Sequence, residues 1–282
     1  MAQRLAGEPT PGERHAAEAL REEMATISTP LRPCQPGTAE EAWLRFRTAL
    51  RSDALTKDCR FFLNWPVIKR TMFVSPRRKS VRMLELPALR EAGWLPYLSE
   101  DFIGTPMLIT GLPTSTNLIH HAYHLLRFEQ ATGKSISEYP RVFEFGGGYG
   151  SMCRLVHRLT FGSSTVTILD LPEFTALQRY YLGLLSIPAI LVSSAGELDP
   201  AAPADLFIAT WSVSEVPVAD RRLVLEYASL SRAFLIAFQD QFGEINNVEF
   251  FQDWIETVEG VVWTMEETGH RKGNYYLFGA RE

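Results

Sequence analysis

The sequence contains few cysteines and no extended apolar segment. Its three cysteines form no Cys-x-x-Cys pair, which argues against a disulfide framework and against a zinc knuckle. No apolar run approaches the roughly 20 residues needed to cross a bilayer, and the N-terminal residues lack the apolar core of a secretory signal. We therefore expect a cytoplasmic protein without a membrane partner.

An excess of basic charge is also missing. Lys and Arg total 28 residues against 33 for Asp and Glu, so the formal net charge is -5. Because nucleic-acid readers carry a basic surplus, we expect no nucleic-acid partner. With 46% hydrophobic and 22% charged residues, the composition is that of an ordinary globular protein. The 282 residues allow one large domain, or one domain with a substantial extension.

The first 112 residues show no alternation of strands and helices. Residues 12–27 and 38–52 have helical spacing of apolar positions, and Thr38 is a predicted N-cap. Residues 60–112 are apolar but interrupted by proline and glycine. We predict a helical extension or lid over residues 1–112. Its aromatic side chains would form core, a homodimer interface or a cover over an acceptor: Trp43, Phe61, Phe62, Trp65, Phe73, Trp94 and Tyr97.

Residues 113–282 have the alternating pattern of an α/β domain. A helix is predicted to start at Ser115 and to end near Gly133. Helical patterns separate the strands that follow, which indicates parallel pairing, but the short loop GHRKG between the last two strands permits only an antiparallel hairpin. The strands are predicted at 141–145, 164–170, 189–193, 205–211, 234–239, 261–268 and 274–280.

A glycine-rich turn joins the first of these strands to a helix. It reads EFGGGYG from Glu144 to Gly150. Glycines at this place let the backbone turn sharply and let a ligand approach closely. Asp170 ends the second strand, where a carboxylate can accept hydrogen bonds from the ribose hydroxyls of a nucleoside. The turn and this acid together predict a nucleoside-containing cofactor.

The details of the turn favour S-adenosylmethionine over a nicotinamide dinucleotide. A dinucleotide site would place its third small residue at Ser151, whereas this turn has the G-x-G-x-G spacing. Glu144 would face a pyrophosphate unfavourably but suits a cationic ammonium group.

At these residues the sequence resembles the class I S-adenosylmethionine-dependent methyltransferases. The segments FEFGGGYGSMCRL, ILDLPEFTALQRYYL and DLFIATWSVSEVP are also similar to the sugar O-methyltransferase family of bacterial biosynthetic pathways. The resemblance implies an α/β fold, a Rossmann-like seven-stranded methyltransferase sheet whose last strand is antiparallel, preceded here by the helical extension. It implies S-adenosylmethionine as the cofactor and a small-molecule acceptor.

The resemblance also assigns cofactor-binding residues. The turn and its acid would hold the methionine part: Glu144, Gly146, Gly147, Gly148 and Gly150. Asp170 would bind the ribose, while Leu171, Ser194 and Ala195 would border the adenine. Trp211 lies in the cofactor site as well, at a position where a small polar residue such as Asn is expected.

Methylation of a hydroxyl needs a group that takes up its proton. The candidate catalytic residues are His121, His270 and Glu215, and the candidate substrate-binding residues are His120, His124, Ser212 and Gln239. His120 and His124 are spaced to share a metal ion, but no third ligand is evident, so we predict no metal site. A divalent ion such as Mg²⁺ could still polarise the alcohol.

The sequence thus predicts a methyltransferase that modifies a hydroxyl of a small molecule, with a sugar or a glycosylated natural product as the leading acceptor class. Two alternatives stay open. One is N- or C-methylation of a non-sugar metabolite, and the other is a cofactor-binding partner protein without turnover.

Overall fold

The computed structural model describes residues 7–28, 38–72 and 79–281. The α-helices in this part are α1 (Pro11–Thr26), α2 (Ala39–Thr56), α3 (Pro66–Thr71), α4 (Leu86–Glu91), α5 (Thr116–Thr132), α6 (Ser151–Leu159), α7 (Pro172–Leu184), α8 (Val218–Ala228) and α9 (Asn247–Ile255). Short helical turns are η2 (Cys59–Asn64), η3 (Val81–Glu85), η4 (Leu95–Tyr97), η5 (Ile136–Glu138), η6 (Ala195–Glu197) and η7 (Val213–Glu215). None of the described helices is both long enough and apolar enough to cross a membrane.

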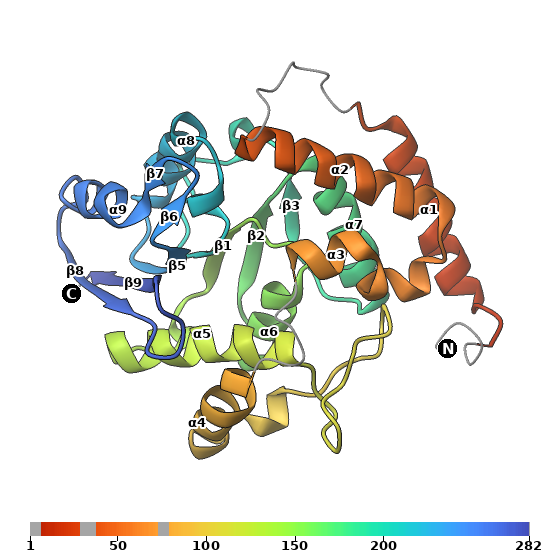
Figure 1. Cartoon of the computed structure of the whole chain (residues 1–282), viewed down its shortest axis with the longest axis horizontal. Helices are drawn as coiled ribbons and strands as arrows, with labels where there is room; N and C mark the ends of the chain where they lie inside the picture. The colour runs from red at the N-terminus through yellow and green to blue at the C-terminus, as the bar shows by residue number, and fades with distance from the viewer. Residues whose placement is uncertain (1–6, 29–37, 73–78, 282) are drawn as a thin grey trace.

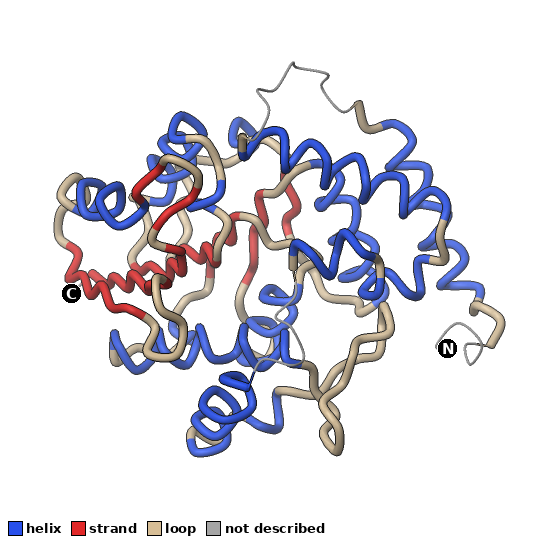
Figure 2. The backbone as a smooth tube through the Cα atoms, viewed as in Figure 1, coloured by secondary structure: helices blue, strands red, loops and turns tan. Residues whose placement is uncertain are grey.

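A seven-stranded sheet runs through the centre of the molecule (Figures 1 and 2). Its strands are β1 (Arg141–Phe145), β2 (Thr165–Leu169), β3 (Ile190–Val192), β4 (Leu206–Thr210), β5 (Ala233–Gln239), β8 (Val261–Glu267) and β9 (Asn274–Arg281), and a separate small hairpin is made of β6 (Gln241–Phe242) and β7 (Ile245–Asn246).

The strand order is β3-β2-β1-β4-β5-β9-β8. Strands β1 to β5 pair in parallel, whereas β9 is antiparallel to both of its neighbours. The predicted fold is confirmed: this is a Rossmann-like seven-stranded sheet whose last strand is antiparallel. The order reverses at β1, so the carboxyl ends of β1 and β4 flank the crevice in which such sheets bind ligands.

The sequence signals for the helix ends are confirmed too. The Thr38 side chain accepts a hydrogen bond from the Glu41 amide at the start of α2, and the Ser115 side chain does the same for Leu118 in α5. Gly133 ends α5 with a φ of 67°, in the left-handed region that favours glycine. Helix α9 and the β6–β7 hairpin are absent from the sequence-based prediction.

Two apolar layers sandwich the sheet because side chains alternate along each strand. On β4, Leu206 and Ile208 face one layer, and Phe207 and Ala209 face the other. The first layer contains α5, α6, α7 and the N-terminal helices, and the second contains α8 and α9. Glu144 follows Val142 on the first face, so its carboxyl group points toward the helices that follow the glycine turn.

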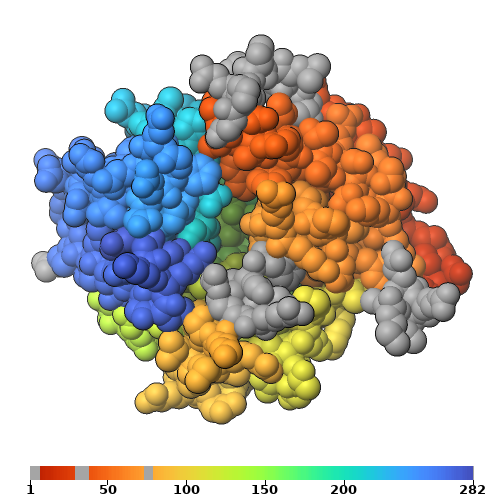
Figure 3. Space-filling model, in the orientation of Figure 1, coloured from red at the N-terminus to blue at the C-terminus, as the bar shows by residue number. Residues whose placement is uncertain are grey.

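The N-terminal helices share the first layer instead of forming a core of their own. Helix α1 lies along α7, and α2 packs against both α1 and α7 (Figure 1). The rings of Trp43 and Phe174 meet edge-on at 6.0 Å, and Arg47 Nε donates to the buried carboxylate of Glu173 at 2.7 Å. In Figure 3 these helices (red and orange) cover one side of the molecule, opposite the C-terminal elements (blue).

The segment that links these helices to α5 folds into short helices and loops. The aromatic side chains for which the sequence predicts a core, interface or lid role differ in burial. Phe61, Phe62, Trp65 and Trp94 are buried in the core, whereas Tyr97 is half-buried. Phe73 lies outside the described residues. Within this segment, η3 is a single π-helical turn.

The Arg47–Glu173 pair gives a testable account of how α2 is held. Arg47→Met should lower the free energy of unfolding by about 3 kcal/mol, because it removes the guanidinium that compensates a fully buried carboxylate. Arg45→Met is the matched control on the same helix: Arg45 pairs with Glu41 at 3.6 Å and is 68% exposed, so we expect little change. Urea unfolding measures both variants, and equal losses would contradict this account.

Candidate functional site

The glycine turn after β1 is packed so closely that side chains do not fit. A Cβ on Gly146 would lie 2.3 Å from Ser212 Cβ, and one on Gly147 would lie 2.6 Å from Ile168 Cγ2. Gly146, Gly148 and Gly150 also have positive φ angles of 72°, 61° and 94°. Both constraints require glycine at these positions.

Asp170 fastens this turn to α7. Its Oδ2 accepts hydrogen bonds from the Gly148 amide and from Gln178 Nε2, both at 2.9 Å, and its Oδ1 accepts one from the Leu171 amide at 2.8 Å. Burial raises the pKa of Asp170 to about 7, against the opposing effect of these hydrogen bonds. A carboxylate has about four acceptor sites, so Asp170 keeps capacity for one further donor.

Glu144 lies beneath the turn as a buried acid. Its side chain is 4% exposed, and Oε2 has no hydrogen-bond partner among the described residues. Burial, reinforced by the charge of Asp170, raises the pKa of Glu144 to about 8. A buried acceptor without a partner next to a glycine turn is well suited to a cationic donor.

The other residues predicted around the nucleoside lie at the ends of β2 and β3. Leu171 is the N-cap of α7 and is half-buried. Ser194 is exposed and accepts a hydrogen bond from the Gly196 amide, and Ala195 beside it is half-buried. These three residues follow the carboxyl ends of neighbouring strands, beside the glycine turn.

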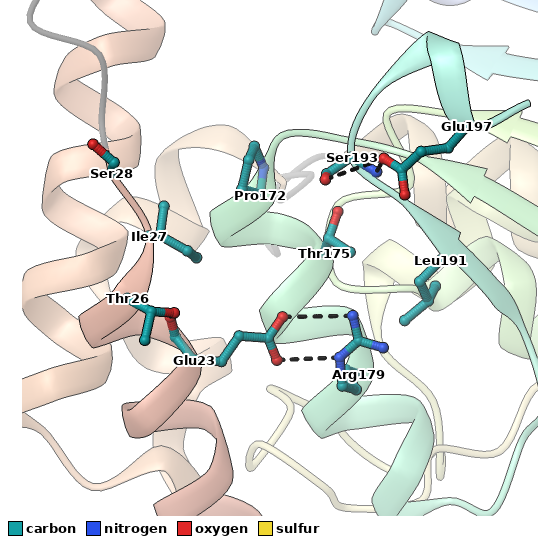
Figure 4. A pocket seen from close by; sticks show the side chains of 10 residues that line it. All are labelled: Glu23, Thr26, Ile27, Ser28, Pro172, Thr175, Arg179, Leu191, Ser193 and Glu197. Carbon is teal, nitrogen blue, oxygen red and sulfur yellow. Dashed lines mark hydrogen bonds and ion pairs between the residues drawn. The ribbon is translucent and has the colours of Figure 1, made fainter.

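A cavity of about 410 Å³ lies at the same edge of the sheet, between α1, α7 and β3 (Figure 4). The ion pair between Glu23 and Arg179, at 3.1 Å, crosses its wall. None of its lining residues is among those predicted from the sequence: Glu23, Thr26, Ile27, Ser28, Pro172, Thr175, Arg179, Leu191, Ser193 and Glu197.

Trp211 and Ser212 connect the glycine turn to the histidines. The Ser212 hydroxyl donates to the carbonyl oxygen of Phe145 at the start of the turn. Trp211 has a φ of 57°, a region that is costly for a bulky residue and easier for Asn. Its indole Nε1 donates to Asn274 Oδ1 at 3.1 Å, and its ring stacks on His120 at 5.4 Å. The guanidinium of Arg271 lies 4.9 Å from the centre of the indole ring.

Three of the histidines belong to α5, but they have different surroundings. His124 Nδ1 is 2.6 Å from the Tyr276 hydroxyl, and its ring lies 4.2 Å from that of His120. Burial lowers the pKa of His121 to about 3 and also lowers the pKa of His124. Both rings are therefore neutral at pH 7, and His121 is too weakly basic to hold a proton there.

His120 and His270 share a carboxylate that the sequence did not indicate. His120 Nδ1 lies 3.0 Å from each oxygen of Glu85, and His270 Nε2 lies 2.8 Å from Glu85 Oε1. Burial by itself would raise the pKa of Glu85, but the hydrogen bonds and charges of the two histidines outweigh burial and lower this pKa to about 2. Glu85 is therefore ionised at pH 7, between the two rings.

The remaining predicted residues lie near the ends of β4 and β5. Burial raises the pKa of Glu215 to about 7, partly opposed by Arg271. Gln239 Oε1 accepts a hydrogen bond from the Ser214 hydroxyl at 3.1 Å, so this amide supports the turn that carries Glu215. In the described part of the chain, no group of three or more His, Cys, Asp or Glu residues is arranged to hold a metal ion.

No protein-family model and no curated protein matches the sequence. Among solved structures, the chain is similar to the N-terminal domain of EvdMO1, crystallised in the presence of SAH and D-fucose, with a TM-score of 0.44, 13% identity, and coverage of 72% of this chain and 99% of that one. A SAM-dependent methyltransferase from Aquifex aeolicus gives a TM-score of 0.40 and 13% identity, covering 49% and 80%. The 16S rRNA methylase ArmA gives 0.40 and 12%, covering 58% and 86%. Likenesses of this size do not bear on what the chain binds or methylates.

Proposed function

We propose that the chain is an S-adenosylmethionine-dependent methyltransferase that modifies a hydroxyl group of a small molecule. The observation that carries this proposal is the position of three groups at the switch point of a sheet with this strand order. They are the closely packed glycine turn, the buried acid Glu144, whose Oε2 has no hydrogen-bond partner among the described residues, and Asp170.

The residues present fit the cofactor at both of its ends. Glu144 Oε2 offers an acceptor to the ammonium of the methionine part. Asp170 has one acceptor position left for a ribose hydroxyl, and Leu171 follows directly for the adenine. When bound, S-adenosylmethionine supplies an electrophilic methyl group on a sulfonium. The protein's part is then to position the acceptor and to take up its proton.

His120 is the residue best placed for that proton. It stacks on Trp211, which precedes Ser212 at the glycine turn, so its ring borders the cofactor crevice. Its Nε2 is buried without a hydrogen-bond partner in the described part of the chain. His121, by contrast, is disfavoured by its low pKa. His270 and Glu215 stay candidates for catalysis, and His124, Ser212 and Gln239 stay candidates for shaping the acceptor site.

A sugar or a glycosylated natural product is the acceptor class we favour, on the strength of the sequence resemblance. A sugar hydroxyl is a poor nucleophile, which agrees with a site that contains several imidazoles and carboxylates.

Calorimetric titration with S-adenosylmethionine, S-adenosylhomocysteine and NAD tests the cofactor. Binding of the first two without NAD is expected, and binding of NAD alone would overturn the proposal.

Replacing Asp170 should weaken the cofactor complex. Asp170→Ala removes the ribose acceptor and a hydrogen-bonded support of the turn, so we expect S-adenosylhomocysteine to bind about 1–3 kcal/mol more weakly, by calorimetry. The control is Asp199→Ala, because this exposed acid accepts a hydrogen bond only within its own turn, from the Ala201 amide. Unchanged affinity in Asp170→Ala would place the ribose elsewhere.

Cofactor binding should release protons. In the free protein the pKa of Glu144 is about 8, so the acid is mostly protonated at pH 7, and an ammonium placed against it lowers that pKa. Affinity for S-adenosylhomocysteine should therefore rise with pH between about 6 and 7.5, by at most about tenfold per unit for each proton released. Titrations in buffers of different ionisation enthalpy count the protons.

Two comparisons isolate Glu144 as the source of this proton. Glu144→Gln should remove its share of the proton release. The ligand 5′-methylthioadenosine lacks the amino-acid part and should release fewer protons from the unmodified protein. If that ligand releases as many protons as S-adenosylhomocysteine, the ammonium does not lie against Glu144.

Loss of the imidazole at position 120 should stop transfer without weakening cofactor binding. In His120→Ala we expect methyl transfer to fall by about 10²–10⁴-fold. The assay uses tritiated S-adenosylmethionine with a panel of free sugars, nucleotide sugars and phenols as acceptors. His157→Ala, on α6, is the control. Full activity in His120→Ala would leave His270 or Glu215 as the base.

A further inference from the structure

The burial pattern around Glu85 is the reverse of what hydrophobicity predicts. Met83 is 69% exposed and Leu84 is 52% exposed, whereas the carboxylate of Glu85 is completely buried. A buried carboxylate costs several kcal/mol unless it is paired, while the two apolar residues would gain from burial. The local structure thus gives up favourable burial in order to direct this acid inward.

The backbone achieves this with a π-helical turn. Val81–Glu85 is π-helical, and the Leu86 amide closes the wide turn by donating to the Val81 carbonyl oxygen. Such turns are rare, and they occur often at functional sites because the extra residue changes which side chains face inward. The N-terminal segment thereby delivers an acid to a place that is otherwise lined by α5 and by the β8–β9 hairpin.

The two rings around Glu85 present different nitrogen atoms to it. The ionised carboxylate can only accept hydrogen bonds, so each facing nitrogen must carry the proton. In its neutral form His120 therefore carries its proton on Nδ1 and has its lone pair on Nε2. The neutral form of His270 carries its proton on Nε2 and has its lone pair on Nδ1. One carboxylate thus fixes opposite tautomers in two histidines.

We propose that Glu85 is the positioning residue of the acceptor site, holding His120 with Nε2 as the proton acceptor and fastening the hairpin through His270. The proposal rests on the proposed function, because it assigns a role within the same methyl-transfer site. During transfer the new carbon–oxygen bond would form as the bond between the methyl carbon and the sulfonium sulfur breaks, with S-adenosylhomocysteine as the leaving group. The acceptor hydroxyl would lose its proton to His120 Nε2, and Glu85 would stabilise the resulting imidazolium across Nδ1–H.

The surroundings of the two rings support different roles. His120 is 4% exposed and stacks on Trp211 beside the glycine turn, where a transferred methyl would arrive. His270 instead lines a cavity of about 310 Å³ between α5 and the hairpin, together with Tyr123, Arg127, Glu266 and Tyr276. The two rings therefore have different neighbours: His120 lies against Trp211, and His270 lies at the cavity beside the hairpin.

The tautomers can be read directly by NMR of protein labelled with ¹⁵N in its histidines, of which there are six. At about pH 8, where an ordinary histidine is neutral, ring correlations distinguish a protonated from an unprotonated nitrogen. We expect His120 as the Nδ1–H form, which is the minor form of free histidine, and His270 as the Nε2–H form. Single replacements of these two residues assign their signals.

Glu85→Gln should shift the signals of both histidines and move His120 toward the Nε2–H form, while affinity for S-adenosylhomocysteine stays within about threefold. Asp205→Asn is the matched control, because Asp205 is a buried carboxylate that pairs with Arg141 elsewhere on the sheet, and it should leave both tautomers unchanged. If Glu85→Gln does not fold, the spectrum of the unmodified protein still decides the question.

Finding His120 as the Nε2–H form in the unmodified protein would overturn the proposal, since Glu85 would not then be setting its tautomer. That result would leave the proposed function standing if S-adenosylhomocysteine binds. Conversely, the protein could show the expected tautomers but bind neither S-adenosylmethionine nor S-adenosylhomocysteine. The contacts of Glu85 would then stand, but its assignment as a positioning residue for methyl transfer would be overturned.

Discussion

Gly146 packs against Ser212, and Gly147 packs against Ile168, at distances that leave no room for a Cβ atom. These two contacts join the turn after β1 to both neighbouring strands. Ile168 is on β2, and Ser212 lies in the loop that follows β4. Asp170 then fixes the turn through the Gly148 amide. The positions of Glu144 beneath the turn and of Trp211 beside it follow from that packing.

Charge burial is distributed unevenly over the site. Among the described residues no cation lies beside the buried acids Glu144 and Asp170, and the pKa of each is raised, to about 8 and about 7. Glu85 is equally buried, but two imidazoles donate to it, and its pKa is lowered to about 2. The first two acids thus keep acceptor capacity that the described residues do not use, whereas the third is already satisfied within the protein.

The N-terminal helices contribute to the site as well as to the core. Arg47 holds α2 to the start of α7 through Glu173, which directly follows the Asp170-Leu171-Pro172 segment. Glu85 reaches the histidines of α5 and of the hairpin. Residues on both sides of position 112 therefore meet in these contacts, and the first layer of the core is continuous across that position.

Local signals in the sequence were sufficient for the sheet, the main helix boundaries and the glycine turn. Apolar periodicity, N-cap residues and the short final loop act over a few residues, so they can be read without knowing the fold. Glu85 could not be found in this way. Its role depends on a π-helical turn that reverses the local hydrophobic pattern, and on two histidines that lie 35 and 185 residues away in the chain. Which nitrogen of His120 contacts a carboxylate was likewise decided by tertiary structure alone, because only the folded chain brings Glu85 to Nδ1.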